Sequence, residues 1–271
     1  MLVLGSCTSF RYAGVNRIRN YDITSSDVPE AFDGYRIAFA SDFHLESKFK
    51  GRQLRGVVNA LQTLAPDVLM LGGDYQEGCE YVAPLFRALA CVTPSDGIYA
   101  VLGNNDYERC TELIRTVMQE YGIRLLEEKI DTIRRGDEYI LVWGANPYMG
   151  RYESVPKNNY KLKAISKEDF AVLLTHTPDY VDDTGVDVAD LALAGHTHGG
   201  QVTLLGLYAP ITASKYGMRY RSGLKHSRRG VPIVISNGLG TSRRPVRLFA
   251  PTDIVIVTLH VKKSLQNSVA E

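Results

Sequence analysis

Short apolar runs recur along the chain, and the first of them alternate with segments of helical periodicity. The runs cover residues 37–40, 68–71, 98–102, 140–143, 171–174, 191–194, 233–235 and 254–257. Apolar side chains at i, i+3, i+4 and i+7 predict helices over 54–61, 82–89 and 114–121, the last of them capped by Gly122. Strand–helix–strand order predicts parallel βαβ units at the front, and the denser runs further on predict a second, more mixed sheet. We therefore expect an α/β protein built as a layered sandwich.

The length and composition are those of one large globular domain. Of the 271 residues, 45% are hydrophobic, which is enough to bury a sizeable core. The formal net charge is +1, so the molecule as a whole gives no indication of nucleic-acid binding. No internal repeat, low-complexity segment or linker divides the chain. We predict an N-terminal extension over 1–33, a main domain over 34–262 and a polar C-terminal tail over 263–271.

The N-terminal extension contains Leu4-Gly5-Ser6-Cys7, which looks like the end of a lipoprotein cleavage site. A signal peptide needs a basic region and an apolar stretch of roughly 7–15 residues before such a site, and this chain has no room for them. The match is therefore either accidental or the end of a longer membrane anchor. No other run approaches about 18 consecutive apolar residues, so we expect no membrane-spanning segment in this sequence.

The four cysteines, Cys7, Cys79, Cys91 and Cys110, show no C-x-x-C spacing and no dense framework. This usage is typical of free thiols in a reducing compartment. We therefore expect a cytoplasmic protein, peripheral at the membrane, or a membrane-anchored one if the N-terminus is truncated.

Polar side chains that can bind metal follow the ends of most predicted strands. They are Asp42, His44, Asp74, Asn104, His176, His196 and His198. In α/β sheets, ligands bind beyond the carboxyl ends of the strands, where the loops converge. Residues two apart on an extended segment point the same way, so Asp42 pairs with His44 and His196 with His198. Seven nitrogen and oxygen ligands are enough for two divalent ions that share one carboxylate.

Each of these short motifs has an ordinary structural explanation when it stands alone. D-x-H and Gly-Asp commonly form turns or helix caps, and a lone histidine is commonly a hydrogen-bonded core residue. Their conjunction at strand ends is what favours a binuclear metal site. His226 and His260 have no such context, and we expect them to be structural.

The order DFH, GGD, GNND, H and GHTH resembles the calcineurin-like metallophosphoesterases, over roughly residues 34 to 260. The resemblance implies a layered αββα sandwich of two mixed β-sheets flanked by helices. Residues 198–201 and 238–242, followed by Pro245 and Arg247, look like the membrane-associated phosphodiesterase branch of that superfamily.

The resemblance also implies a division of the ligands between two ions. Asp42, His44 and His198 would hold one ion, Asn104, His176 and His196 would hold the other, and Asp74 would bridge them. Two such ions lower the pKa of a shared water, and the bridging hydroxide attacks phosphorus in line with the leaving group. Mixed imidazole, carboxylate and amide ligands suit Mn²⁺, which we expect, or Fe or Zn²⁺.

The stretch Gly103-Asn104-Asn105-Asp106 departs from the family's commonest pattern at one position. Asn105 replaces a histidine that gives a proton to the leaving group, and we expect Asp106 to order the loop. An amide donates a hydrogen bond but cannot act as an acid near pH 7. We assign Asn105 and Asp106 to catalysis and expect Asn105 to favour diesters or anhydrides with good leaving groups.

Between Asp190 and Asp253 the chain has no acidic residue but holds nine of its 31 Lys and Arg residues. A solvated face is the plain explanation. An apolar segment over 204–210 beside these charges instead favours a surface that touches anionic lipid. No nucleic-acid module is recognisable. We predict that four arginines of this interval bind substrate: Arg219, Arg221, Arg243 and Arg244.

The sequence thus predicts a binuclear-metal-dependent phosphodiesterase or pyrophosphohydrolase. Its expected substrate is anionic and lipid-linked, such as a UDP-diacylglucosamine-like molecule or a phospholipid headgroup. A soluble cyclic-nucleotide or generic phosphodiesterase is an alternative. A non-catalytic scaffold with the metallophosphoesterase fold is an alternative of another class.

Overall fold

Two mixed β-sheets form the centre of the computed structural model, which describes residues 5–8, 13–145, 165–182 and 186–263. The first sheet has the order β1-β2-β13-β3-β4-β5-β6, and the second has the order β11-β12-β10-β9-β8-β7. The first contains β1 (Gly5–Thr8), β2 (Arg17–Ser25), β3 (Arg36–Ala40), β4 (Val68–Leu71), β5 (Ile98–Ala100), β6 (Arg124–Leu125) and β13 (Asp253–Val261). The second contains β7 (Lys129–Arg135), β8 (Glu138–Ala145), β9 (Ala171–Thr175), β10 (Leu191–Ala194), β11 (Gly223–His226) and β12 (Pro232–Ile235).

Both sheets have a parallel centre and antiparallel pairs outside it. Strands β3, β4, β5 and β6 pair in parallel, and β13 pairs antiparallel with β3. In the second sheet β8, β9, β10 and β12 are parallel, whereas β7 and β11 are antiparallel edges. The expected parallel front and mixed second sheet are therefore confirmed.

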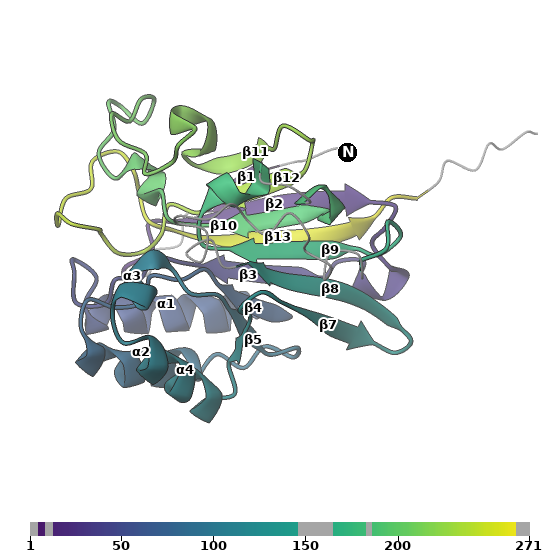
Figure 1. The fold of residues 1–271 in the computed structure, drawn as a ribbon, viewed down its shortest axis with the longest axis horizontal. Coiled ribbons are helices and arrows are strands. Elements are labelled where there is room, and N and C mark those ends of the chain that lie inside the picture. Colours follow the sequence, from purple (N-terminus) through teal and green to yellow (C-terminus); the bar gives the residue numbers. More distant parts are fainter. Residues whose placement is uncertain (1–4, 9–12, 146–164, 183–185, 264–271) are drawn as a thin grey trace, which may run out of the picture.

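The α-helices pack on the outer face of the first sheet (Figure 1). They are α1 (Gly51–Leu64), α2 (Val82–Leu89), α3 (Asn104–Glu108) and α4 (Thr111–Glu120). Alternate side chains of the central strands pack into two different apolar cores, one on each face of the sheet. Leu69 and Leu71 of β4 face the helices, and Val68 and Met70 face the second sheet. Strands buried on both faces are continuous apolar runs, which is why these runs were visible in the sequence.

A third apolar cluster covers the outer face of the second sheet. There Trp143 of β8 packs edge-on against Tyr180, with ring centroids 5.8 Å apart. Tyr180 belongs to a 3₁₀ helix, Pro178–Asp182, and Tyr220 ends another, Gly217–Tyr220. Helical segments thus flank both sheets, which confirms the expected layered sandwich.

The prediction for the cysteines needs correction. Cys79 and Cys110 form a disulfide, so the prediction of free thiols is wrong for this pair, whereas Cys91 is free and exposed. Sequence spacing did not reveal the pair because tertiary packing brings the two cysteines together. Disulfides persist in oxidising compartments, so cysteine usage no longer supports a reducing one.

The N-terminal region contributes to the first sheet. Strand β2 pairs in parallel with β13 from Arg17 to Ser25, inside the segment expected to be an extension. The boundaries at 34 and 262 stay predictions, and residues 264–271 of the predicted tail over 263–271 lie outside the described residues. Within the described ranges, no helix is both long and apolar enough to cross a membrane.

Candidate metal centre

The seven predicted ligands come together where the carboxyl ends of five strands meet. Asp42 and His44 follow β3, Asp74 follows β4, and Asn104 opens α3 after β5. His176 follows β9, and His196 and His198 follow β10. Each is held on a loop that leaves a buried strand, so the two sheets position the two halves of the site against each other.

The ligand atoms form two groups. In the first, atoms of Asp42, His44 and His198 lie within 4.8 Å of one another, and in the second the same holds for Asp74, His176 and His196. Asn104 joins the second group, because its Oδ1 lies 3.2 Å from His176 Nε2.

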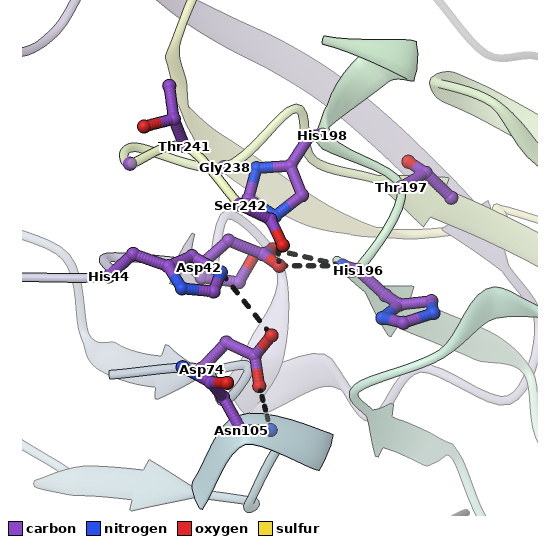
Figure 2. A network of polar contacts seen from close by, with 12 residues as sticks. Asp42, His44, Asp74, Asn105, His196, Thr197, His198, Gly238, Thr241 and Ser242 are labelled. Atoms are coloured by element: carbon purple, nitrogen blue, oxygen red, sulfur yellow. Dashed lines mark hydrogen bonds and ion pairs between the residues drawn. The ribbon is translucent and has the colours of Figure 1, made fainter. Parts of the chain in front are cut away.

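Asp74 lies between the two groups. Its Oδ2 is 3.4 Å from His44 Nε2 and 3.4 Å from His176 Nε2. Its Oδ1 accepts the backbone N–H of Asn105 at 2.9 Å, which holds the carboxylate in this orientation (Figure 2). One carboxylate thus faces a histidine from each sheet.

Five of the ligands adopt a left-handed backbone conformation, which is uncommon for residues other than glycine. The φ angles are 52° for Asp42, 40° for His44, 55° for Asp74, 69° for His196 and 51° for His198. Such a conformation costs free energy and persists only when surrounding contacts enforce it. Here the Asp42 carboxylate accepts the backbone N–H of His196 at 3.0 Å, which locks the loops after β3 and β10 together.

The histidines are oriented by their outer nitrogens. His44 Nδ1 lies 2.6 Å from Glu77 Oε1, and His176 Nδ1 lies 2.7 Å from the carbonyl of Gly72. If these nitrogens carry the protons, the Nε2 atoms are left with lone pairs that face the site. His44 Nε2 is buried and has no hydrogen-bond partner in the described residues. This unpartnered atom lies 3.4 Å from Asp74 Oδ2 and in one group with Asp42, which fits a bound cation.

The pKa values of the candidate ligands also favour a bound cation. Although burial opposes it, the neighbouring histidines hold the pKa of Asp42 below its ordinary value and that of Asp74 well below. Burial would lower the pKa of His44, but Asp74 and Glu77 raise it to about 10. For His198 burial prevails and lowers the pKa to about 3. Two buried carboxylates therefore require positive charge, which a metal ion supplies more strongly than protons do.

Asp106 and Asn105 order the loops instead of entering the ligand cluster. The buried Asp106 carboxylate accepts N–H groups of Asp74 at 2.8 Å, Tyr75 at 3.0 Å and Gly103 at 2.8 Å. Burial and the Asp74 charge raise the pKa of Asp106 to about 7. These contacts are those of a positioning group.

The loop that follows β12 lies directly against the first ligand group. A Cβ on Gly238 would lie 2.5 Å from Asp42 Cβ, and one on Gly240 would lie 2.1 Å from the carbonyl oxygen of Phe43. Gly240 N also donates to the carbonyl of Asp42 at 2.6 Å. Only glycine allows this close backbone approach, which explains the Gly-Leu-Gly sequence at 238–240.

The four arginines predicted to bind substrate differ in their surroundings. Arg221 braces two loops, donating to the carbonyls of Gly199 at 3.1 Å and Gly206 at 2.9 Å. Arg219 is exposed and donates to the carbonyl of His226. Arg243 and Arg244 are exposed on the loop that packs against the metal ligands.

One residue with a clear place in the site was not expected from the sequence. Glu77 contacts His44 from the loop after β4, 33 positions away in the chain. Its nearness to Asp74 in the sequence was the only available signal. The histidines expected to be structural do lie outside the two ligand groups.

Comparison with known proteins agrees with this geometry. The sequence model described as calcineurin-like phosphoesterase matches residues 35–200. The chain belongs to this family. The calcineurin-like phosphoesterases it resembles include the Bacillus subtilis uncharacterized metallophosphoesterase YkuE, 30% identical over 251 residues that cover 88% of this chain and 84% of that protein.

Two further relatives and one solved structure are also similar to this chain. An uncharacterized metallophosphoesterase of Aquifex aeolicus is 28% identical, covering 91% of this chain and 92% of its own. A Danio rerio protein described as a transmembrane protein with metallophosphoesterase domain is 24% identical, covering 90% of this chain and 57% of its own. The Thermus thermophilus protein TT1561 superposes with a TM-score of 0.49 at 17% identity, covering 76% of this chain and 90% of its own.

Family membership makes this protein a hydrolase of phosphoric esters with a metal-binding site. Its substrate therefore contains phosphate. The two groups of buried side chains are the candidate positions for the metal.

Proposed function

We propose that the protein is a binuclear phosphodiesterase or pyrophosphohydrolase. The supporting observation is the position of Asp74, whose Oδ2 lies 3.4 Å from His44 Nε2 and 3.4 Å from His176 Nε2. A carboxylate shared by two groups of ligands is what two adjacent divalent ions require. The first ion would be held by Asp42, His44 and His198, and the second by Asn104, His176 and His196.

The donor set suits Mn²⁺, with Fe or Zn²⁺ as alternatives, because imidazole, carboxylate and amide ligands are combined. Two bound ions would supply an activated water and positive charge for the phosphoryl oxygens. The chain itself supplies the orientation. Glu77 and the carbonyl of Gly72 hold the imidazoles of His44 and His176, and Asp106 holds the backbone that carries Asp74.

Asn105 sets the expected class of leaving group. Its Nδ2 donates to the carbonyl of Gln76 at 3.1 Å, which holds the amide and leaves a second N–H for a phosphoryl oxygen. An amide has no acidic proton to give near pH 7, and general acid catalysis is typically worth about 10²–10⁴-fold. A leaving group that is already stable, such as a phosphate or a phenolate, needs no such proton.

The expected substrate is an anionic, lipid-linked molecule, such as a UDP-diacylglucosamine-like compound or a phospholipid headgroup. Arg243 and Arg244 are exposed on the loop that packs against the first ligand group, where they would attract a phosphate. The Danio rerio relative is described as a transmembrane protein, which supports only the membrane location in this proposal.

The test is hydrolysis of bis-p-nitrophenyl phosphate compared with p-nitrophenyl phosphate, in Mn²⁺, by the wild type and by Asp74→Ala. Both substrates release the same good leaving group, so Asn105 handicaps neither. We expect faster cleavage of the diester and loss of both activities in the variant. Faster cleavage of the monoester would overturn the proposed preference.

A metal measurement on the same preparations separates an enzyme from a scaffold. Two ions bound per wild-type chain with diester cleavage support the proposal. Two ions bound without turnover of any diester or pyrophosphate would leave a non-catalytic protein. A wild type that binds no metal would refute the binuclear centre itself.

The role of Asn105 has its own test. We expect Asn105→His to raise the rate on alkyl diesters, which have poor leaving groups, more than on aryl diesters. Equal changes on the two classes would show that Asn105 does not select the leaving group.

A further inference from the structure

Exposed apolar side chains gather on two loops of the second half of the chain. Among the described residues, ten large apolar side chains are exposed, and nine of them belong to these loops. They are Val202, Leu204, Leu205, Leu207, Tyr208 and Ile211 on one loop and Val246, Leu248 and Phe249 on the other. We call residues 202–211 and 246–249 the apolar tip. A cluster of this kind on a folded surface marks a contact with another phase or molecule.

Hydrogen bonds join the two loops of the apolar tip. Thr203 N donates to the carbonyl of Leu248 at 3.0 Å, and Leu248 N donates to the carbonyl of Gln201 at 2.9 Å. The Thr203 hydroxyl donates to the carbonyl of Phe249 at 3.1 Å. Backbone groups are therefore paired inside the tip, while the apolar side chains point outwards. Leu207 is 77% exposed and Ile211 is 78% exposed.

The tip is continuous with the candidate metal centre. Val202 follows the ligand His198 by four positions, and Arg247 donates to the carbonyl of His198 at 3.2 Å. In Figure 1 the green and yellow-green loops of this region extend from the end of the molecule where α3, and with it Asn104, also lies. A surface that held the tip would therefore lie close to the segment that carries His198.

The charges around the tip distinguish between occupants. From 191 to 252 the chain has no acidic residue, and Arg243 and Arg244 are exposed beside Val246. Apolar side chains that enter the acyl boundary, with cations at the level of the lipid headgroups, match the interface of an anionic membrane. A second copy of this chain would bring the same positive charges against each other.

We propose that the apolar tip inserts into the interface of an anionic lipid bilayer and holds the metal centre at the membrane surface. This deepens the proposed function by naming where a lipid-linked substrate is met, and its role for the substrate rests on that function. Insertion itself requires neither metal nor turnover, so it is tested separately.

The experiment is co-sedimentation of the chain with vesicles of equal parts phosphatidylglycerol and phosphatidylcholine, and with vesicles of phosphatidylcholine alone. We compare the wild type with Leu207→Asp and Ile211→Asp, and with Leu113→Asp as the matched control. Leu113 is 41% exposed on α4, outside the tip. We expect the wild type and the control to bind anionic vesicles, and each tip variant to lose at least about ten-fold in partition coefficient.

A spectroscopic reporter separates insertion from other contacts. The chain has one tryptophan, Trp143, which is buried, so Leu207→Trp adds an exposed probe. We expect a blue shift of its emission with anionic vesicles only. No vesicle binding by the wild type, or equal binding by the tip variants, would overturn the proposal.

Two further readouts cover the alternatives. A wild-type dimer in sedimentation velocity that Leu207→Asp abolishes, without vesicle binding, would assign the tip to a second copy and overturn insertion. Hydrolysis of bis-p-nitrophenyl phosphate in solution is expected to be unchanged in the tip variants. Loss of vesicle binding with this activity intact would support insertion whatever the natural substrate is.

Discussion

Glu77 offers the sharpest test of how the chain supports its metal centre. Its Oε1 lies 2.6 Å from His44 Nδ1, and the Glu77 side chain is 33% exposed whereas that of His44 is 2% exposed. Loss of such an outer partner typically weakens metal binding by about 10–100-fold, which corresponds to about 1.4–2.7 kcal/mol. Because Glu77 is partly solvated, we expect Glu77→Gln, which keeps the hydrogen bond, to lie near the lower value and Glu77→Ala above it.

The assay is calorimetric titration of metal-free protein with Mn²⁺, which resolves the two sites by affinity. Only the site that contains His44 should weaken. Glu46→Gln is the matched control, because Glu46 is 29% exposed and contacts Lys50 instead of a histidine. Unchanged affinity in Glu77→Ala, or an equal loss in Glu46→Gln, would refute the assignment of Glu77 as the residue that orients His44.

Three further outcomes follow from the packing and charges. The Cys79–Cys110 disulfide closes a loop with a sequence separation of 31, so Cys110→Ser should lower the free energy of unfolding by about 3–4 kcal/mol in urea titration; an unchanged midpoint would contradict this. Burial raises the pKa of Asp190 from 3.8 to about 6, so its ionisation begins to oppose folding above pH 3.8 and does so fully above about pH 6. Asp190→Asn should therefore raise Tm at pH 7 and lose this advantage by about pH 4, and a pH-independent change would contradict it. Gly240→Ala would place a Cβ 2.1 Å from a backbone oxygen and should reduce Mn²⁺ affinity, whereas Gly51→Ala, with only an arginine nitrogen 3.9 Å away, should not.

The central strands and the clustering of the seven candidate ligands were predictable because burial and topology leave clear patterns. Strands covered on both faces are continuous apolar runs, and their carboxyl ends carry the polar residues. The cap at Gly122 was predictable too, since its φ of 68° follows α4 and Ile123 N returns to the carbonyl of Met118 at 2.8 Å.

Two strands away from the centres of the sheets, β2 and β7, escaped prediction because their residues are mostly half-buried. Strand β2 has the sequence RIRNYDITS, and β7 has KIDTIRR, so neither forms an apolar run. Their stability comes from pairing with β13 and β8, which local sequence does not encode. The disulfide and the Glu77–His44 contact depend on tertiary proximity in the same way.

Arg247 connects the loop between β12 and β13 to the segment that carries His198. Its Nε donates to the carbonyl of Gly240 at 2.8 Å, and Nη2 donates to that of Asn237 at 2.7 Å. Nη1 donates to the carbonyls of Ala250 at 3.0 Å and His198 at 3.2 Å. Burial lowers the pKa of Arg247 to about 10, yet the group stays charged at neutral pH and remains a full set of donors.

The contacts of this guanidinium join three parts of the structure, of which one is distant in the sequence and two belong to the loop between β12 and β13. They are the glycine loop against Asp42, the ligand segment at His198 and the root of the apolar tip at Ala250. A lysine in the same place has a single nitrogen and could not reach carbonyls on opposite sides of the loop at once. The planar fork of arginine therefore couples the position of the tip to that of a candidate metal ligand. If the tip inserts into a membrane as proposed, these carbonyl contacts would transmit a force on the tip to the segment that carries His198.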